Sequence, residues 1–304
     1  MEAVVAENLV KRYQNGKESI EAVKGLSFKV PPGELFGVIG PDGAGKTSLF
    51  RMLVSLLLPD AGHAAVAGFD TVKDYREIRK QVGYMPGRFS LYQDLTVAEN
   101  LDFFASIFNT TPQENYDLIR DIYVQLEPFR DRRAGKLSGG MKQKLALCCA
   151  LIHKPLVLFL DEPTTGVDAV SRKEFWDMLK HLKEQGITIL VSTPYMDEAS
   201  LCDRVALMQD GKLLSIDTPG EIINAFDRPL FAIRSDNMFH LLNHLQASGK
   251  VEDAYAFGEY QHVVMPKRSS MADLRELLIP GVSSGLEIKP VRANIEDCFI
   301  ALMK

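Results

Sequence analysis

The sequence has 304 residues, of which 46% are apolar and 25% charged, and its net charge is -5. This length suits one large domain with a smaller one, and the acidic balance gives no reason to expect nucleic acid as a partner. No stretch approaches about 18 uninterrupted apolar residues and the start lacks the order of a signal peptide, so we expect a cytosolic chain that only a partner holds at a membrane.

Residues 1 to about 222 alternate strand-like and helix-like patterns, which predicts a layered α/β domain with a largely parallel sheet. The predicted strands cover residues 3–13, 22–30, 34–40, 156–160, 187–193 and 204–217. The last of these contains Asp210-Gly211, which predicts a hairpin turn. The predicted helices cover residues 99–108 after a capping box at Thr96, 118–129, a run from Ser138, and 171–185 closed by Gly186.

A second unit is predicted from about Ala225, so we divide the chain into residues 1–224 and 225–304. Its elements read strand, helix, two strands, helix and strand, followed by a short helix over residues 294–303. The order βαββαβ predicts a ferredoxin-like α+β fold. We expect this unit to be an interaction or regulatory module.

The cysteines do not point to a metal site or to disulfides. None of them has CxxC spacing, and two are adjacent within an apolar run. We therefore expect small core side chains and a reducing compartment. The four positions are Cys148, Cys149, Cys202 and Cys298.

A glycine-rich motif follows the predicted strand 34–40 and precedes a helical pattern. It fits GxxxxGK[ST], in which successive backbone N–H groups cradle phosphates at a helix N-terminus. Lys46 is then expected to reach the outer phosphates and Thr47 to bind Mg²⁺. The alternative is a glycine-rich turn without a ligand. The predicted phosphate-binding residues are Gly40, Pro41, Asp42, Gly43, Ala44, Gly45, Lys46, Thr47 and Ser48.

The apolar strand 156–160 runs into two carboxylates, Asp161 and Glu162. A buried sheet does not tolerate such a pair without compensation, and a metal ion would supply it. Asp161 therefore suits a Mg²⁺ ligand and Glu162 the general base for an attacking water, with Lys46 and Glu162 as the catalytic pair. The alternative is that the two carboxylates only cap a helix.

Between these two motifs, Leu137-Ser138-Gly139-Gly140-Met141 resembles the signature motif of the ATP-binding cassette (ABC) superfamily. The resemblance covers residues 1 to about 222. It implies a mixed-sheet core, an antiparallel β subdomain and a helical subdomain at about residues 85–150. It also implies that Ser138, Gly139 and Gly140 face the γ-phosphate of ATP bound by another subunit.

The resemblance assigns two further residues. Tyr13 stands where an aromatic ring stacks on adenine, although it is also explained as a core aromatic of a strand. Asp168 closes the segment 163–168, which is similar to the D-loop, where an aspartate contacts the partner subunit near both nucleotides.

Two positions depart from the pattern of the family. Gly87 replaces the glutamine of GYxPQ, and Pro194 replaces the histidine that donates to the γ-phosphate. We predict that the chain's own site binds ATP and Mg²⁺ but hydrolyses ATP slowly, while its signature completes a faster site on a partner. Arg88, Ser192 or Thr193 is expected to compensate in part. Locally, Thr193 suits the N-cap and Pro194 the first turn of a helix.

The motifs together are similar to the first ATPase half of bacterial tandem-cassette multidrug-efflux transporters of the ABC-2 type. This implies a second cassette, either another chain or a second copy, and membrane permease subunits at the inner face of the cell membrane. Those subunits are expected to dock near residues 87–101, where the apolar residues Phe89, Leu91, Tyr92 and Leu95 also fit a subdomain core. The alternatives are a nucleotide-gated switch with little hydrolysis and a non-transport ABC ATPase.

Overall fold

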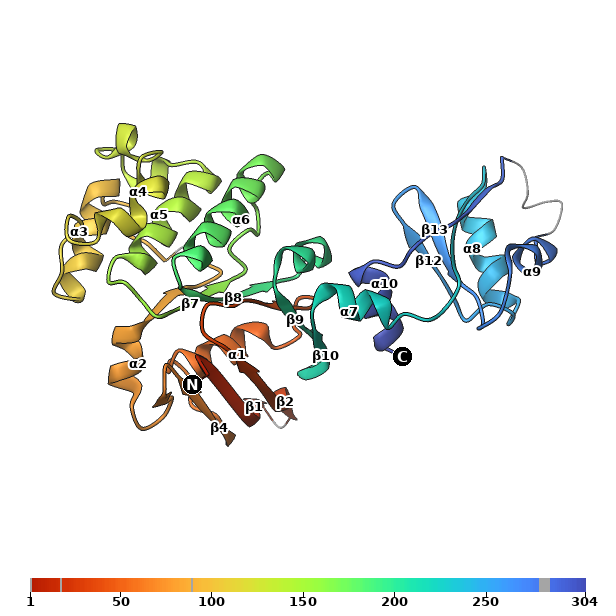
Figure 1. Ribbon diagram of the computed structural model, residues 1–304, viewed down its shortest axis with the longest axis horizontal. Coiled ribbons are helices and arrows are strands. Elements are labelled where there is room, and N and C mark those ends of the chain that lie inside the picture. The colour runs from red at the N-terminus through yellow and green to blue at the C-terminus, as the bar shows by residue number, and fades with distance from the viewer. Residues whose placement is uncertain (1, 17, 89, 279–284) are drawn as a thin grey trace. The chain divides into compact units, whose positions relative to one another are not determined.

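The computed structural model describes residues 2–16, 18–88, 90–278 and 285–304 (Figure 1). The chain divides into one compact unit that ends at Pro219 and a second that covers Gly220–Leu302. Within the described ranges, no helix is long and apolar enough to cross a membrane.

The centre of the first unit is a six-stranded sheet with the order β10-β9-β3-β8-β7-β6. Five strands run parallel, and β10 pairs with β9 in the antiparallel sense. The strands β3 and β7 are buried along their whole length. Strands covered on both faces are typically apolar throughout, as these two are up to Asp161 at the end of β7. The strands are β3 (Leu35–Ile39), β6 (Val82–Met85), β7 (Val157–Asp161), β8 (Thr188–Thr193), β9 (Arg204–Gln209) and β10 (Lys212–Asp217).

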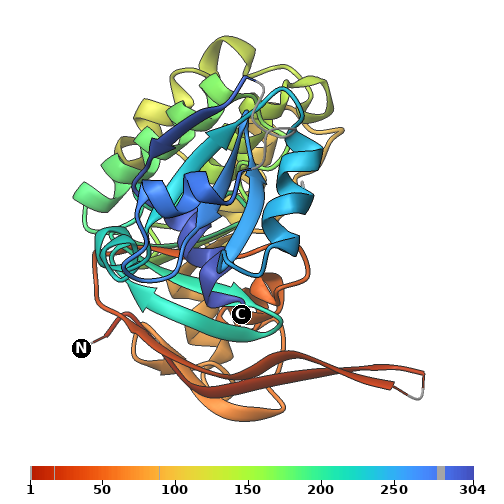
Figure 2. The same ribbon diagram turned by 90° about the vertical axis from the view of Figure 1, so that its right-hand side faces the viewer.

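A second, antiparallel sheet has the order β2-β1-β4-β5. It consists of β1 (Val4–Asn15), β2 (Glu18–Val30), β4 (Ala61–Val66) and β5 (Phe69–Asp70). The strands β1 and β2 form the long hairpin drawn in red in Figure 2. Side chains of this sheet, of α1 (Lys46–Leu53) and of the central sheet share one buried core, in which Phe50 packs edge-to-face on Phe159.

The remaining helices of this unit include the helical subdomain. They are α2 (Tyr75–Gln81), α3 (Val97–Ile107), α4 (Tyr116–Tyr123), α5 (Gly139–Leu151) and α6 (Ala169–Glu184), with 3₁₀ turns at Glu127–Phe129, Ala134–Lys136 and Met196–Leu201. The predicted capping box of α3 is present, because Thr96 Oγ1 accepts from Glu99 N and Thr96 N donates to the Glu99 carboxylate. The predicted helix 118–129 is too long, since α4 ends before Pro128, which lies in a 3₁₀ turn.

The second unit contains α7 (Pro219–Asn224), β11 (Leu230–Arg234), α8 (Met238–Ala247), β12 (Asp253–Phe257), β13 (Tyr260–Val264), α9 (Met271–Glu276), β14 (Glu287–Pro290) and α10 (Ile295–Leu302). Its antiparallel sheet has the order β12-β13-β11-β14. This order confirms the ferredoxin-like fold. The helix α10 is anchored by the buried Asp297, whose Oδ1 accepts from Tyr255 Oη at 2.8 Å and lies 2.6 Å from His262 Nδ1.

Candidate active site

The predicted phosphate-binding loop, residues 40–47, joins the buried strand β3 to α1. Gly40 N donates to Thr193 O at 3.2 Å, which extends the β3–β8 pairing by one residue. A side chain at Gly40 would overlap the carbonyl oxygen of Met208. Gly43 and Gly45 have φ values of 82° and 103°, which L-residues rarely adopt. The glycines therefore let this backbone bend tightly into the N-terminus of α1.

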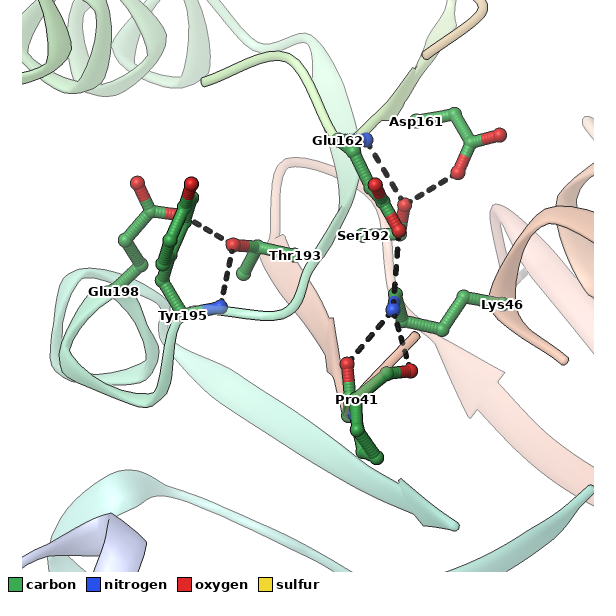
Figure 3. A network of polar contacts seen from close by, with 9 residues as sticks. Pro41, Lys46, Asp161, Glu162, Ser192, Thr193, Tyr195 and Glu198 are labelled. Atoms are coloured by element: carbon green, nitrogen blue, oxygen red, sulfur yellow. Dashed lines mark hydrogen bonds and ion pairs between the residues drawn. The ribbon is translucent and has the colours of Figure 1, made fainter. Parts of the chain in front are cut away.

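Lys46 opens α1 and only 3% of its side chain is exposed. Its ammonium donates to Gly40 O at 2.7 Å and to Pro41 O at 3.0 Å, and it lies 3.1 Å from Glu162 Oε1 (Figure 3). A buried ammonium needs partners of this kind. The structure thus brings the predicted catalytic pair, Lys46 and Glu162, into direct contact.

Asp161 ends β7 and is 2% exposed. Its Oδ1 accepts from Ser192 Oγ at 2.6 Å, while Oδ2 makes no hydrogen bond within the described ranges. The first turn of α1 contributes the half-buried Thr47. A carboxylate and a hydroxyl are hard oxygen donors that suit Mg²⁺. The described ranges hold no group of three or more His, Cys, Asp or Glu residues that could bind a metal ion.

Glu162 has an unusual backbone for a glutamate, with φ at 51°. Its N–H is shared between Ser192 O at 3.0 Å and Ser192 Oγ at 3.1 Å. A left-handed conformation outside glycine costs on the order of 1–2 kcal/mol and persists where the surroundings enforce it. Here it turns the Glu162 side chain out of the sheet and towards Lys46.

The segment after β8 differs from the prediction that a helix begins at Thr193 and Pro194. The 3₁₀ turn begins at Met196 with Tyr195 at the N-cap, so the prediction of Thr193 as N-cap is wrong. The physical reason is that the Thr193 hydroxyl donates to the buried Glu198 at 2.5 Å, while accepting from Tyr195 N at 3.1 Å. Glu198 in turn lies 3.7 Å from Arg172 of α6, and that guanidinium stacks over the Tyr195 ring.

This network also bears on the expected compensation for the missing histidine. Ser192 donates its proton to Asp161, and Thr193 donates its proton to Glu198. Neither hydroxyl is therefore free to replace the lost donor, which corrects that part of the prediction. Gly87 faces the carbonyl of Asp161, where an added Cβ would lie 3.0 Å from the oxygen, and the neighbouring Arg88 is exposed.

The signature segment, residues 137–141, begins α5. Ser138 is exposed and caps the helix, since its Oγ accepts from Met141 N at 3.3 Å. Gly140 packs so closely on α6 that an added Cβ would lie 2.7 Å from Ser171 Oγ. In the described ranges, no hydrogen bond joins residues 138–140 to residues 40–48. The structure thus places the signature beside α6 of its own chain.

Asp168 is exposed and caps α6, because its Oδ1 accepts from Val170 N at 3.1 Å and from Ser171 N at 3.0 Å. The backbone hydrogen bond from Ser171 holds the pKa of this carboxyl below its usual range. Tyr13 is 39% exposed, and its hydroxyl lies 3.1 Å from Ser48 Oγ of α1. Tyr13 is therefore a surface residue beside the start of α1, next to the predicted phosphate-binding loop, and not part of the core.

A groove of about 320 Å³ lies between the β6 end and α3. Leu91 of the predicted docking segment lines it, whereas Tyr92 is 51% exposed, Leu95 is half-buried and Phe89 lies outside the described residues. Phe104 and Ile107 of α3, which lie outside the predicted docking segment, also line the groove. The apolar face of that helix was visible in the sequence, where it was interpreted only as part of the fold.

All four cysteines are buried and unpaired, and burial raises their pKa. Reactive cysteines are usually exposed and have a lowered pKa. These four therefore act as core side chains.

The sequence is similar to known ABC transporter proteins. Residues 23–165 match the ABC transporter family. The chain is 38% identical to "Probable multidrug ABC transporter ATP-binding protein YbhF" of Escherichia coli over 99% of its length and 52% of that protein, so it spans about half of this relative. It is 35% identical to "Nod factor export ATP-binding protein I" of Burkholderia lata, covering 92% of this chain and 91% of that one.

Solved structures show the same fold in the first unit. The dimeric post-hydrolysis structure of the ATP-binding cassette MJ0796, bound to ADP and Pi, superposes with a TM-score of 0.64 at 26% identity, over 71% of this chain and 98% of that one. The structure of cbiO1 from Clostridium perfringens gives a TM-score of 0.64 at 25% identity, over 73% and 91%. These matches confirm the predicted cassette fold.

Proposed function

We propose, because the chain belongs to the family of ABC transporter ATP-binding proteins, that it is the ATP-binding subunit of an export system. It would couple ATP binding and hydrolysis to transport through separate membrane subunits. The relatives' names point to export, and the direction of transport is part of the proposal. One observation supports the proposal most directly: Lys46, Asp161 and Glu162 lie close together beside the glycine-rich loop (Figure 3).

In this proposal the loop amides and the N-terminus of α1 hold the phosphates, and Tyr13 stacks on adenine. The ammonium of Lys46 leaves the carbonyls of Gly40 and Pro41 for the outer phosphates. Thr47 and Asp161 would hold Mg²⁺, which neutralises charge that develops on the phosphates. Glu162, released from Lys46, accepts a proton from the attacking water.

The proposed hydrolysis is slow at this site. Pro194 has neither a polar side chain nor an N–H, Gly87 lacks the amide of the usual glutamine, and the hydroxyls of Ser192 and Thr193 are committed to carboxylates. Loss of one preorganised donor typically costs on the order of 100- to 1000-fold in rate. ATP binding suffers less, because the loop amides and Lys46 remain.

A second cassette completes the site in this proposal. Ser138 and Gly139 are exposed at the N-terminus of α5. Within the described ranges, neither residue forms a hydrogen bond with the chain's own phosphate-binding loop. The serine and glycines of a partner would therefore face the nucleotide bound here, near Asp168 of the D-loop. If the partner is a different chain, the two sites of the dimer hydrolyse ATP at different rates. If the partner is a second copy of this chain, both sites are equally slow.

The membrane subunits are proposed to dock in the groove lined by Leu91, Phe104 and Ile107. A partner helix with apolar side chains at helical spacing fits such a surface. This arrangement would hold the chain on the cytoplasmic face of the membrane as a peripheral subunit. Tyr92, exposed at the rim, supplies an aromatic contact.

Steady-state ATPase activity of the chain, compared with a Glu162→Gln variant, tests the proposal. Slow turnover that the variant abolishes supports it, and brisk turnover contradicts the slow site. One alternative has structural support: a nucleotide-gated switch, favoured by the committed hydroxyls of Ser192 and Thr193. ATP binding without hydrolysis in the complete assembly, partner cassette and membrane subunits included, would favour the switch.

A further inference from the structure

Ser192 lies at the C-terminal end of β8, opposite Asp161 in the parallel register, and is fully buried. Its hydroxyl contacts two residues at once (Figure 3). It donates to Asp161 Oδ1 at 2.6 Å and accepts from Glu162 N at 3.1 Å. One hydroxyl therefore touches both acidic residues that end β7.

We infer that Ser192 is a positioning residue for these two carboxylates, an inference that rests on the proposed nucleotide-binding function. It fixes the Asp161 carboxylate in the orientation that a magnesium ion requires. It also supports the left-handed backbone of Glu162. Ser192 itself contacts neither the nucleotide nor the metal.

The contact with Asp161 is the stronger of the two. A short O–H···O⁻ bond to a charged acceptor is roughly twice as strong as a neutral one. Because Oδ1 is occupied by Ser192, Oδ2 is the oxygen left for a cation. Ser192 and Asp161 are both buried, so water cannot easily replace the lost donor. Removing the hydroxyl would leave the carboxylate free to rotate.

The contact with Glu162 is partly redundant. Its N–H also donates to Ser192 O at 3.0 Å, and that bond survives the loss of the hydroxyl. The main effect of removing the hydroxyl should therefore fall on the metal affinity. Partners of metal ligands typically contribute about 10- to 100-fold in affinity.

The neighbouring Thr193 offers a matched control. It is equally buried and also donates to a carboxylate, but that carboxylate is Glu198. A variant Thr193→Val removes a buried hydroxyl from the same strand without touching Asp161. If the Mg²⁺ midpoint changes in Ser192→Ala but not in Thr193→Val, the change comes from the contact with Asp161 and not from a general weakening of β8.

The experiment measures binding of a fluorescent, non-hydrolysable ATP analogue to the full chain, first in EDTA and then during a Mg²⁺ titration. Ser192→Ala should leave the affinity in EDTA within about twofold of the wild type and raise the Mg²⁺ midpoint about tenfold or more. Ser192→Thr keeps a hydroxyl and should restore the midpoint. Thr193→Val should leave it unchanged.

An unchanged Mg²⁺ midpoint in Ser192→Ala would overturn the inference. If Ser192→Ala does not fold, as judged by thermal unfolding, Ser192→Val replaces it and is compared with Ser192→Thr, which has the same shape but keeps the hydroxyl. Equal midpoints in the valine and threonine variants overturn the inference equally. A wild-type chain that binds no analogue at all contradicts the proposed function instead. The two failures are thus distinguishable.

Discussion

The ammonium nitrogen of Lys46 lies 3.1 Å from Oε1 of Glu162, so the residue predicted to hold phosphate and the residue predicted to activate water form one ion pair. The Lys46 side chain is buried and the Glu162 side chain is half-buried. In the proposed function, a triphosphate in the loop would compete with this carboxylate for the ammonium. Binding of the nucleotide would then also release Glu162.

Lys46→Ala is expected to weaken ATP binding about 10- to 100-fold, because hydrogen bonds to a charged group contribute roughly 1.5–3 kcal/mol. Isothermal titration calorimetry with MgATP measures the change. Lys136→Ala, which removes an exposed lysine outside the loop, serves as the control and should bind like the wild type. Equal affinities in the two variants would show that Lys46 does not contact the phosphates.

Pro194→His should raise the turnover of ATP about tenfold or more, because it restores a donor at the end of β8. The affinity for ATP should change little. The control is Pro194→Ala, which removes the proline ring and supplies no side-chain donor. Steady-state phosphate release compares the three chains, and equal rates in the histidine and alanine variants would argue against a missing donor as the cause of slow hydrolysis.

Gly40→Ala should destabilise the first unit by about 2 kcal/mol or more, since the new methyl group overlaps the Met208 carbonyl. Gly43→Ala is the matched control in the same loop. Among the described residues other than its two chain neighbours, no atom lies within 4 Å of a Cβ at Gly43, so the cost comes from the left-handed φ of 82° and is about 1–2 kcal/mol. Urea denaturation of each variant measures the difference, and a Gly40 variant as stable as the Gly43 variant would contradict the packing argument.

The second unit should lose stability in acid through Asp297. Burial alone would raise the pKa of this carboxyl, but hydrogen bonds involving His262, Asn294 and Tyr255 hold the pKa below its ordinary value of 3.8. A lowered folded-state pKa means that the stabilisation is present above pH 3.8 and is lost as the pH falls through the folded-state value.

Asp297→Asn tests this prediction, because it removes the charge at nearly constant volume. Hydrogen exchange of α10 should be faster in the variant at pH 7, by the equivalent of about 1–3 kcal/mol. The difference between variant and wild type should shrink as the pH falls below 3.8. A difference that is independent of pH would exclude the carboxylate charge as its source.

Local turn chemistry made much of the fold predictable. Asp210 and Gly211 have φ values of 47° and 78° and form the predicted hairpin turn, and Gly186 at 90° lies at the predicted end of α6. These conformations follow from the residue types alone. The bend of residues 40–47 into α1 was predictable for the same reason, since glycines stand at the two positions with positive φ. The binding of phosphate by this loop stays a prediction.

The contacts at the end of β8 were not predictable in the same way. Thr193 next to a proline is a good local N-cap, but its partner is Glu198, whose carboxylate lies close to Arg172 of α6. Thr193 pairs with a carboxylate of the following 3₁₀ turn, and that carboxylate also lies close to Arg172 of α6. The contact with a helix distant in sequence is a tertiary one, which local propensity does not predict. Ser192 was likewise predicted to donate to the phosphate. The sequence does not show that Ser192 lies opposite Asp161, because the strand register that pairs them is a property of the folded sheet.

Adjacent side chains of a strand point to opposite faces, and β8 uses this alternation at its last two residues. Ser192 bonds to Asp161 on one side, and Thr193 bonds through Glu198 to the helix whose first turn is capped by Asp168. The peptide unit between Ser192 and Thr193 thus connects the two carboxylates at the end of β7 to the helix that Asp168 caps. In the proposed assembly, two neighbouring residues of one strand would therefore link the nucleotide site to the contact with a second cassette.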